Sequence, residues 1–390
     1  MEFQDTTIMN KIELSIVMPC LNEAATIGKC INKAKRFIHN NNISAEIIVA
    51  DNGSIDGSRE IASAEGAKVV RINKRGYGSA LIGGIAAAKG EFIIMGDSDD
   101  SYDFLNLMPL LNELRNGYDL VIGNRFKAGI SPKSMPFLHK YIGNPILSGI
   151  GKLFFGSNIG DFHCGLRGFT KSAFELMNLK TSGMEFASEM IVKSTLYKLK
   201  ITEVPIKLYP DGREGKSHLR SFRDGWRHLR FLLLYSPRWL FLYPGIFLIM
   251  IGIIASIFIF FNPKPTPDIH SLLYSVGSIM IGFQAVIFAV FTKTFAVHEE
   301  LIPMNPFIEN IFKKSTLEVI LIIGGIMLLI GLLGAGYSYY IWREGTFFHL
   351  SITKTMRIVI ASFTLIVLGL QIIFSGFFYS ILKLEVRSKE

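Results

Sequence analysis

Four long apolar runs in the second part of the chain restrict the folds that it can adopt. They cover about residues 240–261, 271–292, 317–341 and 358–382, and their central stretches carry almost no charge. Each run approaches or exceeds the ~20 residues that an α-helix needs to cross a bilayer. The sequence therefore predicts an all-α transmembrane domain at 240–390, and four spans would bring both termini to one side.

The first part of the chain reads as a soluble domain in which short apolar strands alternate with helical stretches. Strands are expected at residues 14–19, 46–50, 68–72, 92–95 and 119–122. Alternation of this kind predicts an α/β fold with a mostly parallel, Rossmann-like sheet. In such a sheet, ligands bind outside the carboxyl ends of the strands.

Two segments of this first part have the character of membrane-surface helices. The stretch 137–155 is nearly all apolar but is interrupted by Gly143 and Pro145. The stretch 219–239 places an apolar, aromatic face beside a stripe of arginines, which suits a helix on an anionic membrane; an ordinary surface helix is the alternative. We therefore expect a globular domain at 1–218 that includes the first segment, and an amphipathic interfacial helix at 219–239.

Net charge and cysteine content narrow the classes of partner. The formal net charge is +9, and no nucleic-acid-binding motif accompanies it. With a membrane part present, we expect membrane lipids and phosphorylated ligands as partners, and no nucleic acid. The three cysteines, Cys20, Cys30 and Cys164, have no metal-binding spacing and predict no disulfide framework.

Three motifs that contain polar residues stand at the ends of expected strands, at the edge where a ligand would bind. They are Pro19 with Asn22 and Glu23, then Asp51, then the acidic run 97–100. Aspartates at positions i and i+2 past a strand can hold a hard divalent cation, and such a cation usually grips a diphosphate. We therefore expect Asp97 and Asp99 to be metal ligands in one shared site. A tight turn after Asp51 and an acidic helix cap at 97–100 are the alternatives.

These motifs, in this order and spacing, resemble those of family 2 glycosyltransferases with the GT-A fold. The resemblance is to the branch of dolichol-phosphate mannose synthase and the bacterial polyprenyl-phosphate glycosyltransferases, and it covers residues 12 to about 235. It implies a nucleotide-diphosphate sugar, UDP- or GDP-linked, as the donor. It also implies Mg²⁺ or Mn²⁺ at Asp97 and Asp99, and donor contacts from Pro19, Asn22, Glu23, Asp51 and Asp97.

Two arginines fall in stretches that resemble the family's sugar pocket. Arg125 lies in the sequence Gly-Asn-Arg-Phe at 123–126, and Arg167 lies in the segment 161–169. By this resemblance both arginines bind the donor.

The basic loop at 213–218 resembles the family's phosphate-binding loop Arg-x-x-Gly-x-Ser-Lys. Its glycine comes one position earlier, and His218 stands where the family has lysine, so either Lys216 or His218 replaces that lysine. We expect the acceptor phosphate to be bound by Arg213, Lys216, Ser217 and His218. The expected catalytic set is Asp97, Asp99, Arg213 and Lys216.

Together these features predict a multi-pass integral membrane enzyme, a metal-dependent, inverting hexosyltransferase. The sugar would pass from the nucleotide to a polyprenyl phosphate, undecaprenyl or dolichyl. Such an acceptor needs no general base, because a phosphate monoester with a second pKa near 6 is largely ionised at neutral pH. We expect the catalytic domain and both termini in the cytosol, and an oligomer is compatible with the sequence.

Three alternatives stay open. The first is transfer to a lipid hydroxyl, and the second is transfer to a polysaccharide. Processive synthases of the family carry a Gln-x-x-Arg-Trp motif, and here Tyr235 stands in place of its glutamine. The third alternative is a non-catalytic membrane scaffold.

Overall fold

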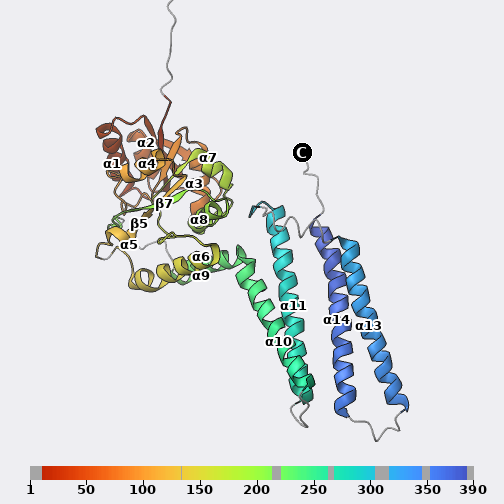
Figure 1. Ribbon diagram of the computed structural model, residues 1–390. Helices are drawn as coiled ribbons and strands as arrows, with labels where there is room; N and C mark the ends of the chain where they lie inside the picture. The colour runs from red at the N-terminus through yellow and green to blue at the C-terminus, as the bar shows by residue number, and fades with distance from the viewer. Residues whose placement is uncertain are drawn as a thin grey trace, which may run out of the picture. The chain divides into compact units, whose positions relative to one another are not determined.

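The computed structural model describes residues 11–132, 134–212, 221–261, 268–303, 316–344 and 352–383. The chain divides into two compact units, Met1–Leu232 (unit 1) and Leu233–Glu390 (unit 2). Figure 1 shows a sheet flanked by helices in unit 1 and long helices in unit 2. The boundary between the units lies near the end of helix α9 (Ser221–Leu234).

Unit 1 is built on a seven-stranded sheet with the order β3-β2-β1-β4-β6-β5-β7. The strands are β1 (Leu14–Cys20), β2 (Ala45–Asp51), β3 (Lys68–Arg71), β4 (Phe92–Met95), β5 (Leu120–Asn124), β6 (Arg167–Thr170) and β7 (Ile201–Pro205). Neighbouring strands are parallel except where β6 pairs antiparallel with β4 and β5. The mostly parallel sheet that the sequence predicted is confirmed.

Helices cover the sheet of unit 1 and connect its strands. They are α1 (Ile27–Asn40), α2 (Ser58–Ala64), α3 (Tyr77–Ala86), α4 (Met108–Arg115), α5 (Arg125–Ala128), α6 (Asn144–Phe155), α7 (Lys171–Met177) and α8 (Phe186–Leu196). All seven residues of β1 are buried, as expected for a central strand covered on both faces. At Gly84 of α3, a Cβ would come within 2.8 Å of Ala50 and Val17, so glycine lets α3 lie directly on β1 and β2.

The register of the parallel strands brings their carboxyl ends to one edge. Cys20, the last residue of β1, lies opposite Asp51, the last residue of β2. On the other side of β1, the backbone N–H of Gly96 donates to the carbonyl of Val17 at 3.2 Å. The turns that follow β1, β2 and β4 therefore meet, and the predicted donor-site motifs lie in these turns or at the strand ends before them.

The apolar stretch at 137–155 forms a π-helical turn, η1 (His139–Gly143), followed by α6. Its large apolar side chains are mostly solvent-exposed, among them Phe137 at 72% and Leu153 at 60%. An exposed apolar face of this size is unusual for a purely aqueous surface, and it suits contact with a membrane interface.

Unit 2 consists of long apolar helices: α10 (Tyr243–Phe261), α11 (Asp268–His298), α13 (Leu317–Glu344) and α14 (Ile352–Leu382), with the π-helical turn η2 (Arg238–Leu242) before α10. Four segments are long and apolar enough to cross a membrane: Arg238–Ile259, Ile269–His298, Leu317–Arg343 and Thr355–Leu382. The predicted four-helix transmembrane part is confirmed, with the second span longer than expected.

Glycines let the helices of unit 2 pack closely in pairs. Figure 1 shows α10 beside α11, and α13 beside α14. A Cβ at Gly245 of α10 would lie 2.8 Å from the carbonyl oxygen of Gly282 on α11. A Cβ at Gly369 of α14 would lie 2.8 Å from the carbonyl oxygen of Gly324 on α13. Small residues at helix contacts are typical of transmembrane bundles, where backbone proximity replaces the hydrophobic effect as the source of attraction.

Candidate active site

Hydrogen bonds tie the turn after β1 to the turn after β2. Asn22 has a left-handed backbone with φ of 57°, its N–H donates to Ser54 Oγ at 3.0 Å, and its Oδ1 accepts from the N–H of Ile55 at 2.9 Å. The N–H of Glu23 donates to Ser58 Oγ at 2.8 Å. The turn after β4 joins them, because Ser98 Oγ donates to the carbonyl of Pro19 at 2.7 Å.

Asp51 lies at the end of β2, and only 1% of its surface is exposed. Its carboxylate accepts hydrogen bonds from the N–H groups of Gly53 at 3.2 Å and Ser54 at 3.1 Å. The tight turn proposed as an alternative is therefore present. A carboxylate oxygen can accept more than one hydrogen bond, so this turn leaves room for the predicted nucleoside contact, which stays a prediction.

The carboxylates of the acidic run after β4 have different hydrogen-bond partners. Asp97 Oδ1 accepts from Tyr77 Oη at 2.7 Å, and Asp99 Oδ1 accepts from Ser101 Oγ at 2.6 Å and from its N–H at 3.1 Å. Asp100 has a left-handed backbone with φ of 61°, and its carboxylate pairs with Lys33 Nζ at 2.6 Å. The carboxylate of Asp100 is therefore tied to helix α1 through Lys33.

The donor set at Asp97 and Asp99 fits a cation that is held partly by its substrate. Among the described residues, no group of three or more His, Cys, Asp or Glu side chains is placed to hold a metal ion by itself. Mg²⁺ is commonly bound by one or two carboxylates together with substrate phosphates and water. Asp97 and Asp99 would supply two such carboxylates to a cation that a substrate diphosphate also binds, and their role as metal ligands stays a prediction.

Gly165 packs against the Asp97 carboxylate from the opposite segment of the site. A Cβ added at Gly165 would collide with Asp97 Oδ2. The N–H of Gly165 is held by Tyr102 Oη at 2.9 Å. With Tyr77 on Oδ1 and Gly165 beside Oδ2, the Asp97 carboxylate is held in one orientation.

Arg125 forms a buried, two-pronged ion pair with Asp161. Its Nε lies 2.7 Å from Asp161 Oδ2, and its Nη2 lies 2.7 Å from Asp161 Oδ1. Burial opposes the charge of Arg125, but the Asp161 carboxylate more than offsets this and raises the pKa of the guanidinium above its ordinary value. The donor-binding role of Arg125 stays a prediction, and the geometry shows that it holds the start of the segment 161–169.

Arg167 is completely buried and donates to three backbone carbonyls. Its partners are Cys164 at 2.8 Å, Phe162 at 2.8 Å and Ala187 at 2.6 Å. Burial lowers the pKa of this guanidinium. The hydrogen bonds tie the turn at 162–164 to α8, so Arg167 fixes the position of this turn, and a direct donor contact stays a prediction.

His163 joins this same turn to helix α9. Its ring lies edge-on to that of His228 with centroids 4.5 Å apart, and His228 Nδ1 lies 2.9 Å from Ser188 Oγ. Both ring nitrogens of His163 are buried and have no hydrogen-bond partner among the described residues. Burial, followed by the nearby His228, Arg125, Arg167 and His139, lowers the pKa of His163 well below 6.5.

Sequence reasoning missed three of the residues that shape the site. Tyr77 had a weak signal, because it follows a glycine at the start of an expected helix. Asp161 lies in the segment 161–169, yet nothing in the sequence pairs it with Arg125. His228 had no signal beyond its place on the amphipathic helix.

The predicted acceptor residues Arg213, Lys216, Ser217 and His218 lie outside the described residues. The chain just before them is anchored at the acidic run. The N–H of Gly212 donates to the carbonyl of Asp99 at 2.9 Å, and the N–H of Tyr209 donates to the carbonyl of Ser101 at 3.0 Å. The segment that leads to the predicted acceptor loop thus starts beside the predicted metal ligands.

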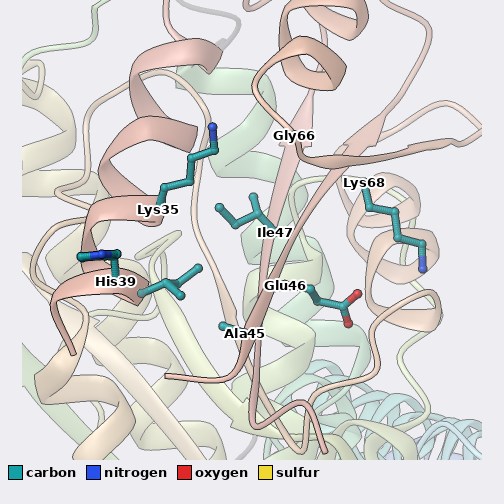
Figure 2. A pocket seen from close by; sticks show the side chains of 8 residues that line it. Lys35, His39, Ala45, Glu46, Ile47, Gly66 and Lys68 are labelled. Atoms are coloured by element: carbon teal, nitrogen blue, oxygen red, sulfur yellow. The ribbon is translucent and has the colours of Figure 1, made fainter. Parts of the chain in front are cut away.

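A pocket of about 490 Å³ lies at the opposite end of the sheet, between α1 and the start of β2 and β3 (Figure 2). No predicted site residue lines it. Its charged side chains already have partners within the fold: Lys35 pairs with Glu65, and Glu46 accepts from Ser15 Oγ. Ligands of parallel sheets bind at the carboxyl ends of the strands. We therefore place the candidate active site at the acidic run.

Comparison with known proteins identifies two matching family models. "Glycosyl transferase family 2" matches residues 15–177, and "Glycosyltransferase family 2 C-terminal transmembrane region" matches residues 290–383.

Several curated relatives match along much of their length. The low-salt glycan biosynthesis hexosyltransferase of Haloferax volcanii is 37% identical over 368 residues, which are 93% of this chain and 87% of that protein. The dolichyl-phosphate hexose transferase of the same organism is 28% identical, over 55% of this chain and 89% of that protein. A solved structure, glucosyl-3-phosphoglycerate synthase from Mycobacterium tuberculosis, matches with a TM-score of 0.47 and 22% identity, over 57% of this chain and 80% of that chain.

Proposed function

This chain belongs to glycosyltransferase family 2, and we propose that it transfers a sugar from a nucleotide-diphosphate sugar to a polyprenyl phosphate. It is an integral membrane glycosyltransferase. The observation that carries the proposal is the joining of the three strand-end motifs at one edge of the sheet, through Asn22, Ser98 and Pro19. That edge is where parallel sheets bind nucleotides.

The donor half of the site would be formed by these motifs. In this proposal Glu23 and Asp51 accept hydrogen bonds from the nucleoside, and Asp97 and Asp99 would hold Mg²⁺ or Mn²⁺ beside the diphosphate. A cation bound there neutralises the charge that develops on the departing nucleoside diphosphate. Tyr77 and Gly165 keep the Asp97 carboxylate oriented, so little reorganisation accompanies the reaction.

The acceptor half is proposed from chemistry and from the relatives. The name of one relative includes dolichyl phosphate, and that of another includes dolichol phosphate. An ionised phosphate needs positioning and charge stabilisation more than it needs proton abstraction. Arg213, Lys216, Ser217 and His218 are the residues proposed for this task, with Arg213 suited to a two-pronged contact with phosphate oxygens.

We further propose that the transferase domain, residues 1–218, and both termini face the cytosol, where nucleotide sugars are made. Helix α9 would lie on the membrane surface, as the predicted interfacial helix at 219–239. Its outer side exposes Trp226 at 58%, together with the exposed Arg223 and Arg230. An exposed tryptophan beside arginines suits the headgroup region.

The test incubates the purified full-length protein with Mn²⁺ or Mg²⁺, a polyprenyl phosphate and a panel of UDP- and GDP-sugars. Mass spectrometry then identifies the lipid product. We expect a glycosyl phosphate that mild acid cleaves. An acid-stable glycoside would instead indicate transfer to a lipid hydroxyl, and no turnover with any donor would favour the scaffold alternative.

A further inference from the structure

We propose that unit 2 carries a recruitment site for the acceptor lipid, in which Arg238 and Lys293 bind the phosphate and an apolar groove between α11, α13 and α14 holds the isoprenoid chain. The inference rests on the proposed function, because it assumes a polyprenyl phosphate acceptor. The site is separate from the reaction site proposed at 213–218.

The turn η2 and helix α10 pack against α11. This packing brings Arg238 and Lys293 to the same end of the helix pair. The helices run antiparallel, with Gly245 against Gly282 and the rings of Phe241 and Phe288 6.0 Å apart. Continuing this register past Phe241 and Phe288 leads to Arg238 on one side and Lys293 on the other. The turn η2, which carries Arg238, packs directly against α11, which carries Lys293.

Neither cation has an acidic partner among the described residues of the chain. Two like charges held together at the end of a membrane helix pair repel each other, so an anion between them would be stabilising. Arginine can form two hydrogen bonds to one phosphate, and lysine adds a point charge. The pair therefore has the composition of a phosphate site.

Aromatic side chains indicate that this end of unit 2 lies at headgroup depth. Trp239 follows Arg238 directly, and its ring lies edge-on to Tyr243 with centroids 5.0 Å apart. Tryptophan and tyrosine gather at the boundary between membrane and water. A lipid phosphate occupies the same depth, so it would meet Arg238 and Lys293 without leaving the bilayer.

An apolar groove of about 220 Å³ is lined by α11 as far as Phe291, two positions before Lys293. Its α11 wall includes Val286 and Val290, and its other walls include Ile320 of α13 and Gly376 of α14. Val286, Val290 and Lys293 are spaced i, i+4 and i+7, so they share one face of the helix. Gly376 lets α14 lie close to α13 at the wall of the groove, because a Cβ there would come within 2.7 Å of Ile320 Cγ2. A headgroup at Lys293 would thus have its chain in the groove.

The two positive charges of the site favour the binding of an isoprenoid monophosphate over that of an ordinary phospholipid. A phosphate monoester carries about −1.5 to −2 charges at neutral pH, which balances the two cations. A bulk phospholipid has a phosphodiester with a single negative charge and two hydrocarbon chains, whereas the site offers two cations and one groove.

The test compares long and short acceptors on the full-length protein in vesicles. In the double variant, Arg238→Gln with Lys293→Gln, the KM for undecaprenyl phosphate should rise at least about tenfold. A tenfold loss of affinity is expected when one hydrogen bond to a charged group is removed. Val290→Phe, which fills the groove, should raise the KM for this long acceptor but not for the ten-carbon citronellyl phosphate. The KM for the sugar nucleotide should not change in either case.

Matched controls separate these effects from general damage to the membrane part. Arg343→Gln removes an arginine at the end of another spanning helix, α13, and Val359→Phe enlarges an exposed valine that does not line the groove. Both controls should behave like the natural protein. Undecaprenyl phosphate kinetics that are unchanged in the site variants would overturn the inference while leaving the proposed function intact.

A binding measurement keeps the inference testable without turnover. A photoreactive polyprenyl phosphate should cross-link to α11 or α14, and the double glutamine variant should lose this labelling. If phosphatidylglycerol competes as well as polyprenyl phosphate does, the site belongs to ordinary phospholipid and the inference is wrong. If the natural protein transfers sugar to neither acceptor but is still labelled, the proposed function fails and the lipid site stands.

Discussion

At the scale of single residues, the three aspartates of the run 97–100 have different surroundings. Asp97 is oriented by Tyr77, Asp99 accepts from Ser101, and Asp100 is paired with Lys33 on α1. The contacts differ from one carboxylate to the next, and the assignment of Asp97 and Asp99 as metal ligands stays a prediction.

Asp99→Asn should reduce divalent-dependent turnover by at least ~100-fold, because the variant loses one of the two charges that hold the cation at the diphosphate. Initial rates measured across a range of Mn²⁺ concentrations check this. Asp100→Asn is the matched control: asparagine tolerates the left-handed backbone there, and its Mn²⁺ dependence should stay close to that of the natural protein. Full activity of the Asp99 variant would rule out the metal assignment.

Gly165→Ala should weaken the metal site without removing any ligand. The added methyl group would collide with Asp97 Oδ2 and push the carboxylate away from the position in which Tyr77 holds it. We expect the Mn²⁺ concentration for half-maximal rate to rise about tenfold, because a displaced carboxylate holds the cation less tightly. Gly149→Ala on α6, where no atom lies within 4 Å of an added Cβ, is the control. An unchanged Mn²⁺ requirement would contradict the close contact.

At the scale of elements, much of the sheet was predictable from the sequence, but the antiparallel strand β6 that interrupts it was not. The strands β1 to β5 were expected from short apolar runs, and the helical stretches between them gave the alternation that indicates a parallel sheet. The strands β6 and β7 went unpredicted. Strand β6 has only four residues, includes Gly168 and a buried arginine, and pairs antiparallel. No local pattern in the sequence encodes such an insertion.

The same limit applies to the candidate site. Residues in turns after strands were predictable, because a strand fixes where its end points. The ion pair between Arg125 and Asp161 spans 36 positions of sequence, and the three carbonyls that hold Arg167 come from backbone atoms that every residue has. Contacts of these kinds depend on tertiary packing, so residue type and spacing do not reveal them.

The stability of the fold around helix α9 and the turn at 162–164 should depend on pH through His163. The folded pKa of His163 lies well below 6.5 because of burial, so the unfolded chain binds a proton first as the pH falls. Stability that is present above about pH 6.5 is then lost below it, by up to about 1.4 kcal/mol per pH unit. Thermal unfolding of the full-length protein between pH 8 and pH 5 measures this loss.

His163→Phe isolates the contribution of this histidine. Phenylalanine keeps the edge-on ring contact with His228 and lacks the two nitrogens that have no hydrogen-bond partner among the described residues. The variant should be at least as stable as the natural protein at pH 7 and should lose less stability toward pH 5. His39→Gln, at an exposed position on α1, should leave the pH profile unchanged. Parallel profiles for the natural protein and His163→Phe would show that another group titrates.

At the scale of the whole molecule, the number of spans determines which ends of the chain share a compartment. Four spanning segments return the chain to its starting side, so unit 1 and the C-terminus should lie together, and the connection between α13 and α14 should lie opposite. Lys293 near the end of α11 and Lys383 after α14 would then face the cytosol, in keeping with the excess of basic residues on cytosolic ends of spans.

Reporter fusions test this arrangement in cells. A fluorescent protein that folds only in the cytosol should fluoresce when fused before Met1 or after Glu390, and alkaline phosphatase, active only outside, should be inactive at both ends. Inserted after Glu344, the two reporters should give the reverse result. If both reporters behave alike at Glu344 and Glu390, one of the four segments does not cross the membrane. Activity of the phosphatase at both termini would put unit 1 outside the cytosol, away from nucleotide sugars, and would contradict the proposed donor.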